Sequence, residues 1–117
     1  MRATVLIVDD HAEFRTSASE LLGAEGFDVV GAAPDAQRAV ELALRLRPQI
    51  VLLDVQLPDQ DGFAVAARLA RESEPPRVVL ISSRDATAYG RRIADAPVHG
   101  FIAKRDLTGA ALAALVS

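Results

Sequence analysis

The stretch "QIVLLDVQLPDQDG", residues 49–62, decides the fold class. Residues 50–53 are consecutive apolar side chains, a pattern typical of a β-strand that is buried on both faces. The run ends on Asp54, so a carboxylate stands at the edge of the expected core. An unpaired charge there costs several kcal/mol, on the order of the desolvation penalty of one ion. The charge must therefore be compensated by a partner or serve a function.

Apolar runs and segments of helical periodicity alternate outward from this strand along the whole chain. Strands are expected at residues 3–8, 27–33, 50–54, 77–82 and 99–104. Helices are expected between and after them, at about 11–26, 35–48, 62–72, 85–95 and 106–116. Gly26 and Pro48 fit the ends of the first two helices, whereas Gly90 interrupts the pattern of the fourth. The alternation predicts an α/β fold in which helices cover both faces of a parallel sheet.

The composition is that of an ordinary globular domain. A chain of 117 residues suits one domain with a single core, and the net charge of -3 argues against general binding of nucleic acid. The chain has no cysteine, which excludes disulfides and thiolate metal sites. No apolar run approaches the roughly 18 residues of a membrane span, and the apolar run near the N-terminus is too short for a signal peptide. A cytoplasmic protein without membrane contact is therefore expected.

Polar side chains stand at the carboxyl ends of four of the five expected strands. They are Asp9 and Asp10, Asp54, Ser82 and Lys104, the only lysine of the chain. The carboxyl ends of parallel strands meet at one edge of a sheet, where such folds bind ligands. Three carboxylates at one edge repel each other unless a cation lies among them, and oxygen ligands suit Mg²⁺. With a lysine and a hydroxyl nearby, such an aspartate can act as a nucleophile that accepts a phosphoryl group.

Four sequence blocks together resemble the receiver domain of response regulators in two-component signalling. The blocks are "LIVDDH", "IVLLDVQLPDQDG", "VVLISS" and "GFIAK", in the order and spacing of that family and across essentially the whole chain. Each block alone is weak evidence, but the four together are specific. The resemblance implies a flavodoxin-like, doubly wound (βα)5 fold whose five-stranded parallel sheet has the order 2-1-3-4-5. It also implies one receiver domain over residues 1–117, with no output domain in this chain.

The resemblance assigns a phosphoacceptor and a metal site. Asp54 matches the phosphoacceptor, and Lys104 matches the lysine that pairs with the phosphoryl group. Asp10 matches a direct Mg²⁺ ligand, and Asp9 matches a ligand that acts through water. Gln56 offers its backbone carbonyl to the metal, so its side chain is free to vary.

The resemblance also assigns a switch and a loop. Ser82 matches the hydroxyl that moves to bond the phosphoryl group, and Phe101 matches the aromatic position coupled to it. Pro58 and Gly62 match the turn after the acceptor strand. The expected readout is a change of the face formed by the fourth helix, the fifth strand and the last helix, at 85–95, 99–104 and 106–116. Dimerisation of two chains through that face would follow phosphorylation.

Family membership would make the chain a signalling phosphoacceptor rather than an enzyme. Its phosphoryl group would come from a sensor histidine kinase or a phosphotransfer protein. Many receivers have proline after the lysine, whereas Arg105 stands here. That departure and the "DDH" block favour the subfamily that carries a helix-turn-helix output domain, so the signal would reach transcription without nucleic-acid binding by this domain.

Simpler interpretations remain open for single residues. Asp9 and Asp10 could begin a solvated loop, with Asp10 capping the following helix. Asp59 and Asp61 are expected to be ordinary turn residues. His11 is expected on the surface of the first helical turn, displaced from the carboxylates. Phe101 could be core packing alone. Arginines of the fourth helix and after the fifth strand could form charge pairs in a dimer.

Three other functions remain possible on the same sequence. A small phosphatase with an aspartyl nucleophile would place a D-x-D pattern after the first strand, where "VDDHAEF" has none. A nucleotide- or flavin-binding module would need a phosphate loop at that point, and two aspartates would repel a phosphate. A degenerate receiver that acts only as an interaction module would retain the same residues without being phosphorylated.

Overall fold

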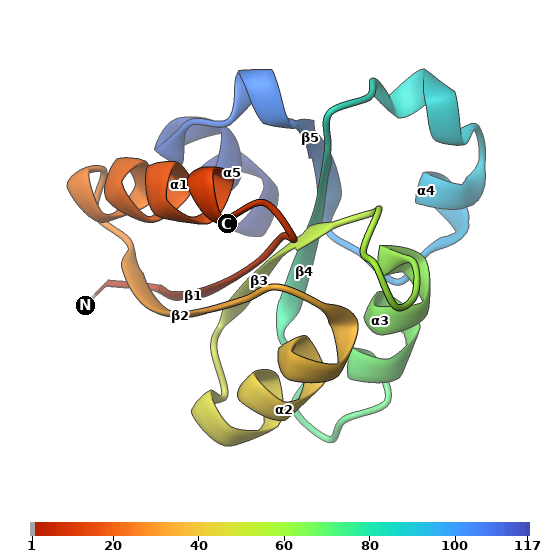
Figure 1. Ribbon diagram of the computed structural model, residues 1–117, viewed down its shortest axis with the longest axis horizontal. Coiled ribbons are helices and arrows are strands. Elements are labelled where there is room, and N and C mark those ends of the chain that lie inside the picture. The colour runs from red at the N-terminus through yellow and green to blue at the C-terminus, as the bar shows by residue number, and fades with distance from the viewer. Residues whose placement is uncertain (1) are drawn as a thin grey trace.

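The computed structural model describes residues 2–117 and contains a five-stranded parallel sheet between two layers of helices (Figure 1). The strands are β1 (Thr4–Val8), β2 (Asp28–Ala33), β3 (Ile50–Asp54), β4 (Arg77–Ser82) and β5 (Gly100–Ala103). Their order across the sheet is β2-β1-β3-β4-β5, and every neighbouring pair is parallel. The predicted α/β fold and strand order are therefore confirmed.

The longer helices cover the two faces of the sheet in different pairs. The helices α1 (Ala12–Ala24) and α5 (Gly109–Val116) cover one face. The other face is covered by α2 (Ala36–Leu46) and α3 (Gly62–Leu69), with the short α4 (Arg92–Asp95) beside α3 (Figure 1). Within residues 2–117, no helix combines the length and the apolar character needed to cross a membrane.

The two faces of the sheet form two hydrophobic clusters because side chains alternate along each strand. In β1, Val5 and Ile7 pack towards α1 and α5, whereas Leu6 and Val8 pack towards α2 and α3. The strand β3 is buried along its whole length, Asp54 included. This explains the continuous apolar run that ends on a charge: a central parallel strand is covered on both sides, and only its carboxyl end reaches the edge.

The helix predicted over residues 85–95 is wrong as one element. The chain forms a 3₁₀ turn, η1 (Ala86–Tyr89), and then the separate one-turn helix α4. Gly90 lies between them with φ 56°, in the left-handed region that interrupts a right-handed helix. The last helix begins later than predicted: α5 starts at Gly109, and Asp106 belongs to a preceding 3₁₀ turn, η2 (Lys104–Asp106). Thr108 caps α5 by accepting from the Ala111 N–H.

Gly62 allows α3 to begin directly against the end of β3. A Cβ atom at this position would lie 2.4 Å from the Asp54 carbonyl oxygen and 2.9 Å from the Val55 Cα. The Gly62 N–H donates to the Val55 carbonyl at 2.7 Å. Because both close neighbours are backbone atoms, a larger residue would have to move the strand end that carries Asp54.

Gly62→Ala is expected to destabilise the protein by about 1–3 kcal/mol, the usual range for overpacking against a fixed backbone. Urea unfolding measures the change. Gly23→Ala in α1 is the matched control, since a Cβ there has no neighbour within 4 Å and alanine favours the helix. A Gly62→Ala variant as stable as the parent would contradict this account of the loop.

Candidate functional site

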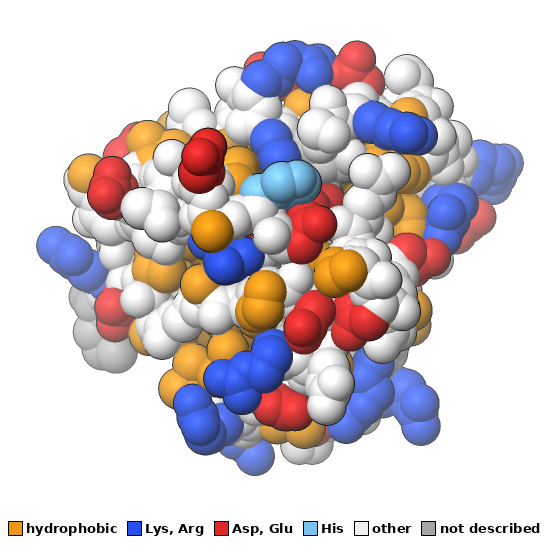
Figure 2. Space-filling model, in the orientation of Figure 1, with side chains coloured by type: hydrophobic (Ala, Val, Ile, Leu, Met, Phe, Trp, Pro, Cys, Tyr) orange, Lys and Arg blue, Asp and Glu red, His pale blue; other side chains and the backbone are white. Residues whose placement is uncertain are grey.

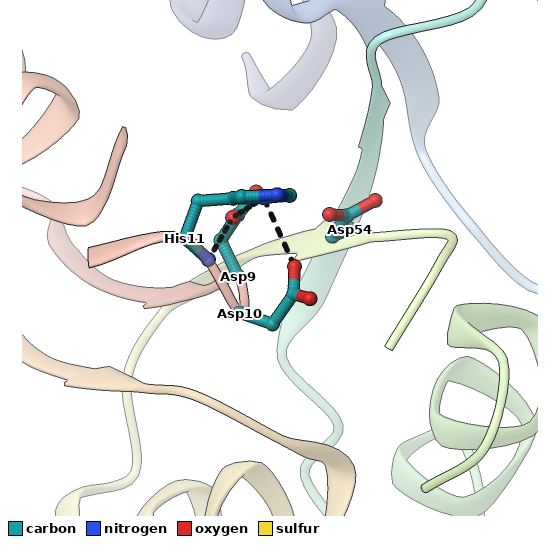
Figure 3. A group of neighbouring side chains, drawn as sticks. All are labelled: Asp9, Asp10, His11 and Asp54. Atoms are coloured by element: carbon teal, nitrogen blue, oxygen red, sulfur yellow. Dashed lines mark hydrogen bonds and ion pairs between the residues drawn. The ribbon is translucent and has the colours of Figure 1, made fainter. Parts of the chain in front are cut away.

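Three carboxylates converge at the carboxyl ends of the neighbouring strands β1 and β3 (Figure 3). Asp9 and Asp10 follow β1, and Asp54 is the last residue of β3. One oxygen of each lies within 4.8 Å of the others and of a ring nitrogen of His11. Asp9 and Asp54 are buried, whereas Asp10 is exposed. Figure 2 shows acidic side chains beside a histidine in the middle of this face of the molecule.

Lys104 joins the two buried carboxylates. Its Nζ lies 2.5 Å from Asp9 Oδ2 and 3.1 Å from Asp54 Oδ2. The ammonium also lies over the Phe14 ring, 4.8 Å from the ring centroid, which is a cation–π geometry. The sequence predicted this lysine as the last residue of the fifth strand; in the structure it directly follows β5, and its side chain extends to the ends of β1 and β3. The predicted grouping of Asp9, Asp10, Asp54 and Lys104 is therefore present.

The pKa values of the two buried aspartates are shifted in opposite directions. Burial raises the pKa of Asp54 to about 6, helped by the charge of Asp9 and opposed by the Gln56 N–H and Lys104. Burial also acts to raise the pKa of Asp9, but Lys104 and the His11 N–H outweigh it and lower that pKa. Lys104 behaves as their partner, since both carboxylates raise its pKa against the effect of burial. Asp9 and Lys104 thus form the stronger of the two ion pairs. The negative charge of Asp54 is less well stabilised, and a further cation would stabilise it.

The donor set fits a hard divalent cation. Asp9, Asp10 and Asp54 supply only oxygen atoms, the ligands that Mg²⁺ prefers, and their charge exceeds what Lys104 neutralises. The backbone of Gln56 lies next to the carboxylate cluster, because its N–H donates to Asp54 Oδ1 at 3.0 Å. The Gln56 side chain is exposed. The role of its carbonyl as a metal ligand stays a prediction.

Asp54→Asn is expected to raise the free energy of unfolding near neutral pH. The pKa of Asp54 in the folded chain, about 6, exceeds its ordinary value of 3.8, so the folded chain binds this proton more tightly than the unfolded chain. Stability of the parent should therefore fall as pH rises from about 4 through about 6, by roughly 1–2 kcal/mol after allowance for solvent screening. Asparagine cannot ionise and avoids this loss. Urea unfolding across that pH range tests this, and equal pH profiles for both proteins would contradict it.

The expectation for His11 is wrong in one respect. Its side chain is exposed, as expected, but it is not displaced from the carboxylates. The ring Nδ1 lies 3.2 Å from Asp9 Oδ1 and 3.0 Å from Asp10 Oδ1 (Figure 3). His11 is the N-cap residue of α1 with an extended backbone, which turns its ring back towards β1. Asp10 is consequently not the cap, and the Asp9 side chain accepts from the His11 N–H at 2.8 Å.

Asp59 and Asp61 organise the loop after β3 instead of joining the cluster. Asp59 accepts from the Ala36 and Gln37 N–H groups at the start of α2, and Asp61 accepts from the Ala64 N–H at the start of α3. Asp61 is therefore the N-cap residue of α3, whereas Asp59 caps α2 from a distant part of the chain, beside the N-cap residue Asp35. The distance in sequence between Asp59 and α2 hides the first of these contacts from any local pattern.

Ser82 ends β4, as the sequence predicts, and it is buried against a partner that the sequence does not predict. The hydroxyls of Ser82 and Tyr89 lie 2.5 Å apart, and Ser82 Oγ also accepts from the Arg84 N–H at 3.0 Å. Phe101 is half-buried on β5, with its ring centroid 5.9 Å from that of Tyr89. Tyr89 is the only tyrosine of the chain, which is the one signal that could have drawn attention to it.

Comparison of the chain with known proteins identifies a matching family and several relatives. The sequence model of the response regulator receiver domain matches residues 5–115. The transcriptional regulatory protein PdtaR of Mycobacterium tuberculosis is 42% identical over 89 residues, which are 74% of this chain and 43% of that protein. The chain spans about half the length of the curated relatives it matches.

Two solved structures share the fold over nearly the whole chain. The signal receiver domain of the response regulator NarL from Mycobacterium tuberculosis has a TM-score of 0.85 and 32% identity, covering 97% of this chain and 96% of that one. The CheX-CheY-BeF3-Mg complex from Borrelia burgdorferi has a TM-score of 0.83 and 26% identity, covering 97% of this chain and 86% of that one.

Proposed function

The chain belongs to the response regulator receiver domain family, and on that basis we propose that it accepts a phosphoryl group on Asp54 with Mg²⁺. Receivers are signalling domains of two-component systems, and the donor here would be a histidine kinase or a phosphotransfer protein. The observation that carries the proposal is the buried Asp54, only partly compensated by Lys104, beside Asp9 and Asp10.

The side chains around Asp54 suit attack on phosphorus. Asp54 Oδ1 is held by the Gln56 N–H and Oδ2 by Lys104, so the carboxylate has a defined orientation before the donor arrives. A bound Mg²⁺, held by Asp10 and Asp54 with Asp9 acting through water and the Gln56 carbonyl as a further ligand, would neutralise charge on the incoming phosphoryl oxygens. Lys104 would turn from Asp54 to the phosphoryl group while Asp9 keeps its ammonium in place.

Incubation of the chain with a small-molecule phosphodonor and Mg²⁺, read by intact mass, tests the proposal. A folded chain that gains one phosphoryl group, only with Mg²⁺ present, supports it. A folded chain that gains none would favour the interaction module that works without phosphorylation.

The proposed output is control of transcription in the cytoplasm. The basis is that PdtaR is named a transcriptional regulatory protein. The receiver itself would not contact nucleic acid, since its net charge is -3. Its part would be a phosphorylation-dependent change of the face formed by α4, β5 and α5, and a homodimer through that face is the expected readout.

Two arginines at or beside this face, Arg92 of α4 and Arg105 of η2, are already engaged within one chain. Arg92 pairs with Asp61 at 3.1 Å and lies over the Phe63 ring, and Arg105 pairs with Asp85. Exposed pairs of this kind contribute about 0–1 kcal/mol, so they can exchange for contacts with a second chain. A dimer through this face would therefore require these charge pairs to open first.

Ser82→Ala is expected to separate phosphorylation from its consequence. The change removes the hydroxyl that would bond the phosphoryl group, and a hydrogen bond to a charged group contributes about 1.5–3 kcal/mol to the switched state. Phosphorylated Ser82→Ala should therefore remain monomeric under conditions where the phosphorylated parent dimerises. Sedimentation of both proteins, with and without phosphodonor, measures this. Equal dimerisation of the two phosphorylated proteins would exclude Ser82 as the switch.

A further inference from the structure

We propose that Tyr89 is a positioning residue, whose hydroxyl holds Ser82 in the resting state and must release it when Asp54 is phosphorylated. The proposal rests on the function proposed above. It gives η1, the turn after β4, a role in the switch: Tyr89 of this turn would connect Ser82 to Phe101. The observation behind it is the 2.5 Å contact between the Ser82 and Tyr89 hydroxyls.

The hydrogen bonds of Ser82 leave little capacity for another partner. A serine hydroxyl has one proton to donate and two lone pairs. The Arg84 N–H uses one lone pair, and Tyr89 uses either the other or the proton. Ser82 is fully buried, so bulk water cannot replace a lost partner. The switch proposed above moves the Ser82 hydroxyl towards the phosphoryl group, and this movement breaks the contact with Tyr89 whichever of the two hydroxyls donates in it.

The ring of Tyr89 connects this hydrogen bond to the neighbouring elements. It lies between two aromatic side chains, with ring centroids 6.0 Å from Phe63 of α3 and 5.9 Å from Phe101 of β5. Both pairs have the tilted or edge-on geometry that aromatic rings favour. A change in the position of Tyr89 must therefore be accommodated by Phe63 and Phe101 together. Phe101 would respond to phosphorylation through Tyr89 rather than through Ser82 directly.

Tyr89 is also the anchor of its own turn. In η1, the other three residues, Ala86 to Ala88, are exposed, and only Tyr89 is partly buried. Gly90 follows with φ 56° and separates the turn from α4. Once the Ser82 bond is lost, few buried contacts of the turn itself hold it in place, which is the property expected of an element that moves.

The first test compares Tyr89→Phe with the parent in binding the phosphoryl mimic beryllofluoride with Mg²⁺, followed by fluorine NMR. Phenylalanine keeps the ring between Phe63 and Phe101 and removes only the hydroxyl. Because a neutral hydrogen bond is lost from the resting state alone, beryllofluoride should bind roughly twofold to tenfold more tightly. In a Ser82→Ala background the same substitution should change nothing, because the bond is already absent. An equal gain in both backgrounds, or no gain in either, would overturn the proposal.

The second test needs no phosphorylation. Tyr89 is the only tyrosine and the chain has no tryptophan, so the near-ultraviolet tyrosine band reports on this residue alone. Ser82→Ala should shift the band of the protein without ligand, and the exposed neighbour Ser83→Ala should not. Beryllofluoride should shift the parent band in the same direction. An unshifted band in Ser82→Ala would refute the role of Tyr89, whereas a parent that binds no beryllofluoride would refute the proposed function instead.

Discussion

Asp54→Asn is expected to abolish the gain of a phosphoryl group from a small-molecule donor. The amide nitrogen and oxygen of asparagine are poor nucleophiles, and the other buried carboxylate cannot substitute. Both oxygens of Asp9 are engaged, one by the Lys104 ammonium and one by the His11 N–H. Of the two buried carboxylates, Asp54 is the one whose pKa is raised above its ordinary value. Intact-mass measurement after incubation with donor and Mg²⁺ should show the loss as complete.

Asp59→Asn and Asp61→Asn are the matched controls for this result. Each removes one carboxylate from the loop that follows Asp54, yet both side chains cap helices away from the cluster. Asparagine keeps an oxygen that can accept the same N–H bonds, so the stability of these variants should change by no more than about 1 kcal/mol. Both should be phosphorylated like the parent. A phosphoryl group that persists in Asp54→Asn would refute the assignment of the acceptor.

Asp10→Ala is expected to weaken Mg²⁺ binding by about tenfold or more. Substituting a residue that only hydrogen-bonds to a metal ligand already costs about tenfold in affinity, and loss of a direct ligand should cost at least as much. Asp10 is exposed, and its carboxylate contacts only the His11 ring among the interactions found in residues 2–117. Its oxygens are therefore available to the ion. Calorimetric titration with Mg²⁺ measures the change, and an unchanged affinity would exclude Asp10 as a ligand.

Asp9→Asn is the comparison for Asp10→Ala and should affect the protein differently. Asp9 is fully buried and pairs with Lys104, so breaking this pair should lower the free energy of unfolding by an amount on the order of 3 kcal/mol. Its effect on Mg²⁺ affinity should be the smaller of the two. Asparagine is preferred to alanine here because it keeps an acceptor for the His11 N–H. A larger loss of affinity for Asp9→Asn than for Asp10→Ala would exchange the predicted roles of the two residues.

The sequence was most informative where burial imposes a regular pattern. The strand β3 was predicted with its observed bounds because a central parallel strand must be apolar on both faces. It was least informative over residues 85–95, where the predicted helix is divided at Gly90. That segment buries few side chains, so its periodicity is weak. The conformation of one glycine then has more influence than the helical propensity of its neighbours.

What the sequence by itself determined is the α/β alternation and the identity of the side chains at the carboxyl ends of the strands. Those follow from hydrophobic periodicity and from the geometry that every parallel sheet shares. Only the tertiary structure decided which of these side chains contact each other. It brings the His11 ring back onto Asp9 and Asp10, gives Lys104 to Asp9 as well as Asp54, and places the Tyr89 hydroxyl against Ser82. Such contacts depend on rotamers and on the backbone angles of short loops, which local residue patterns do not encode.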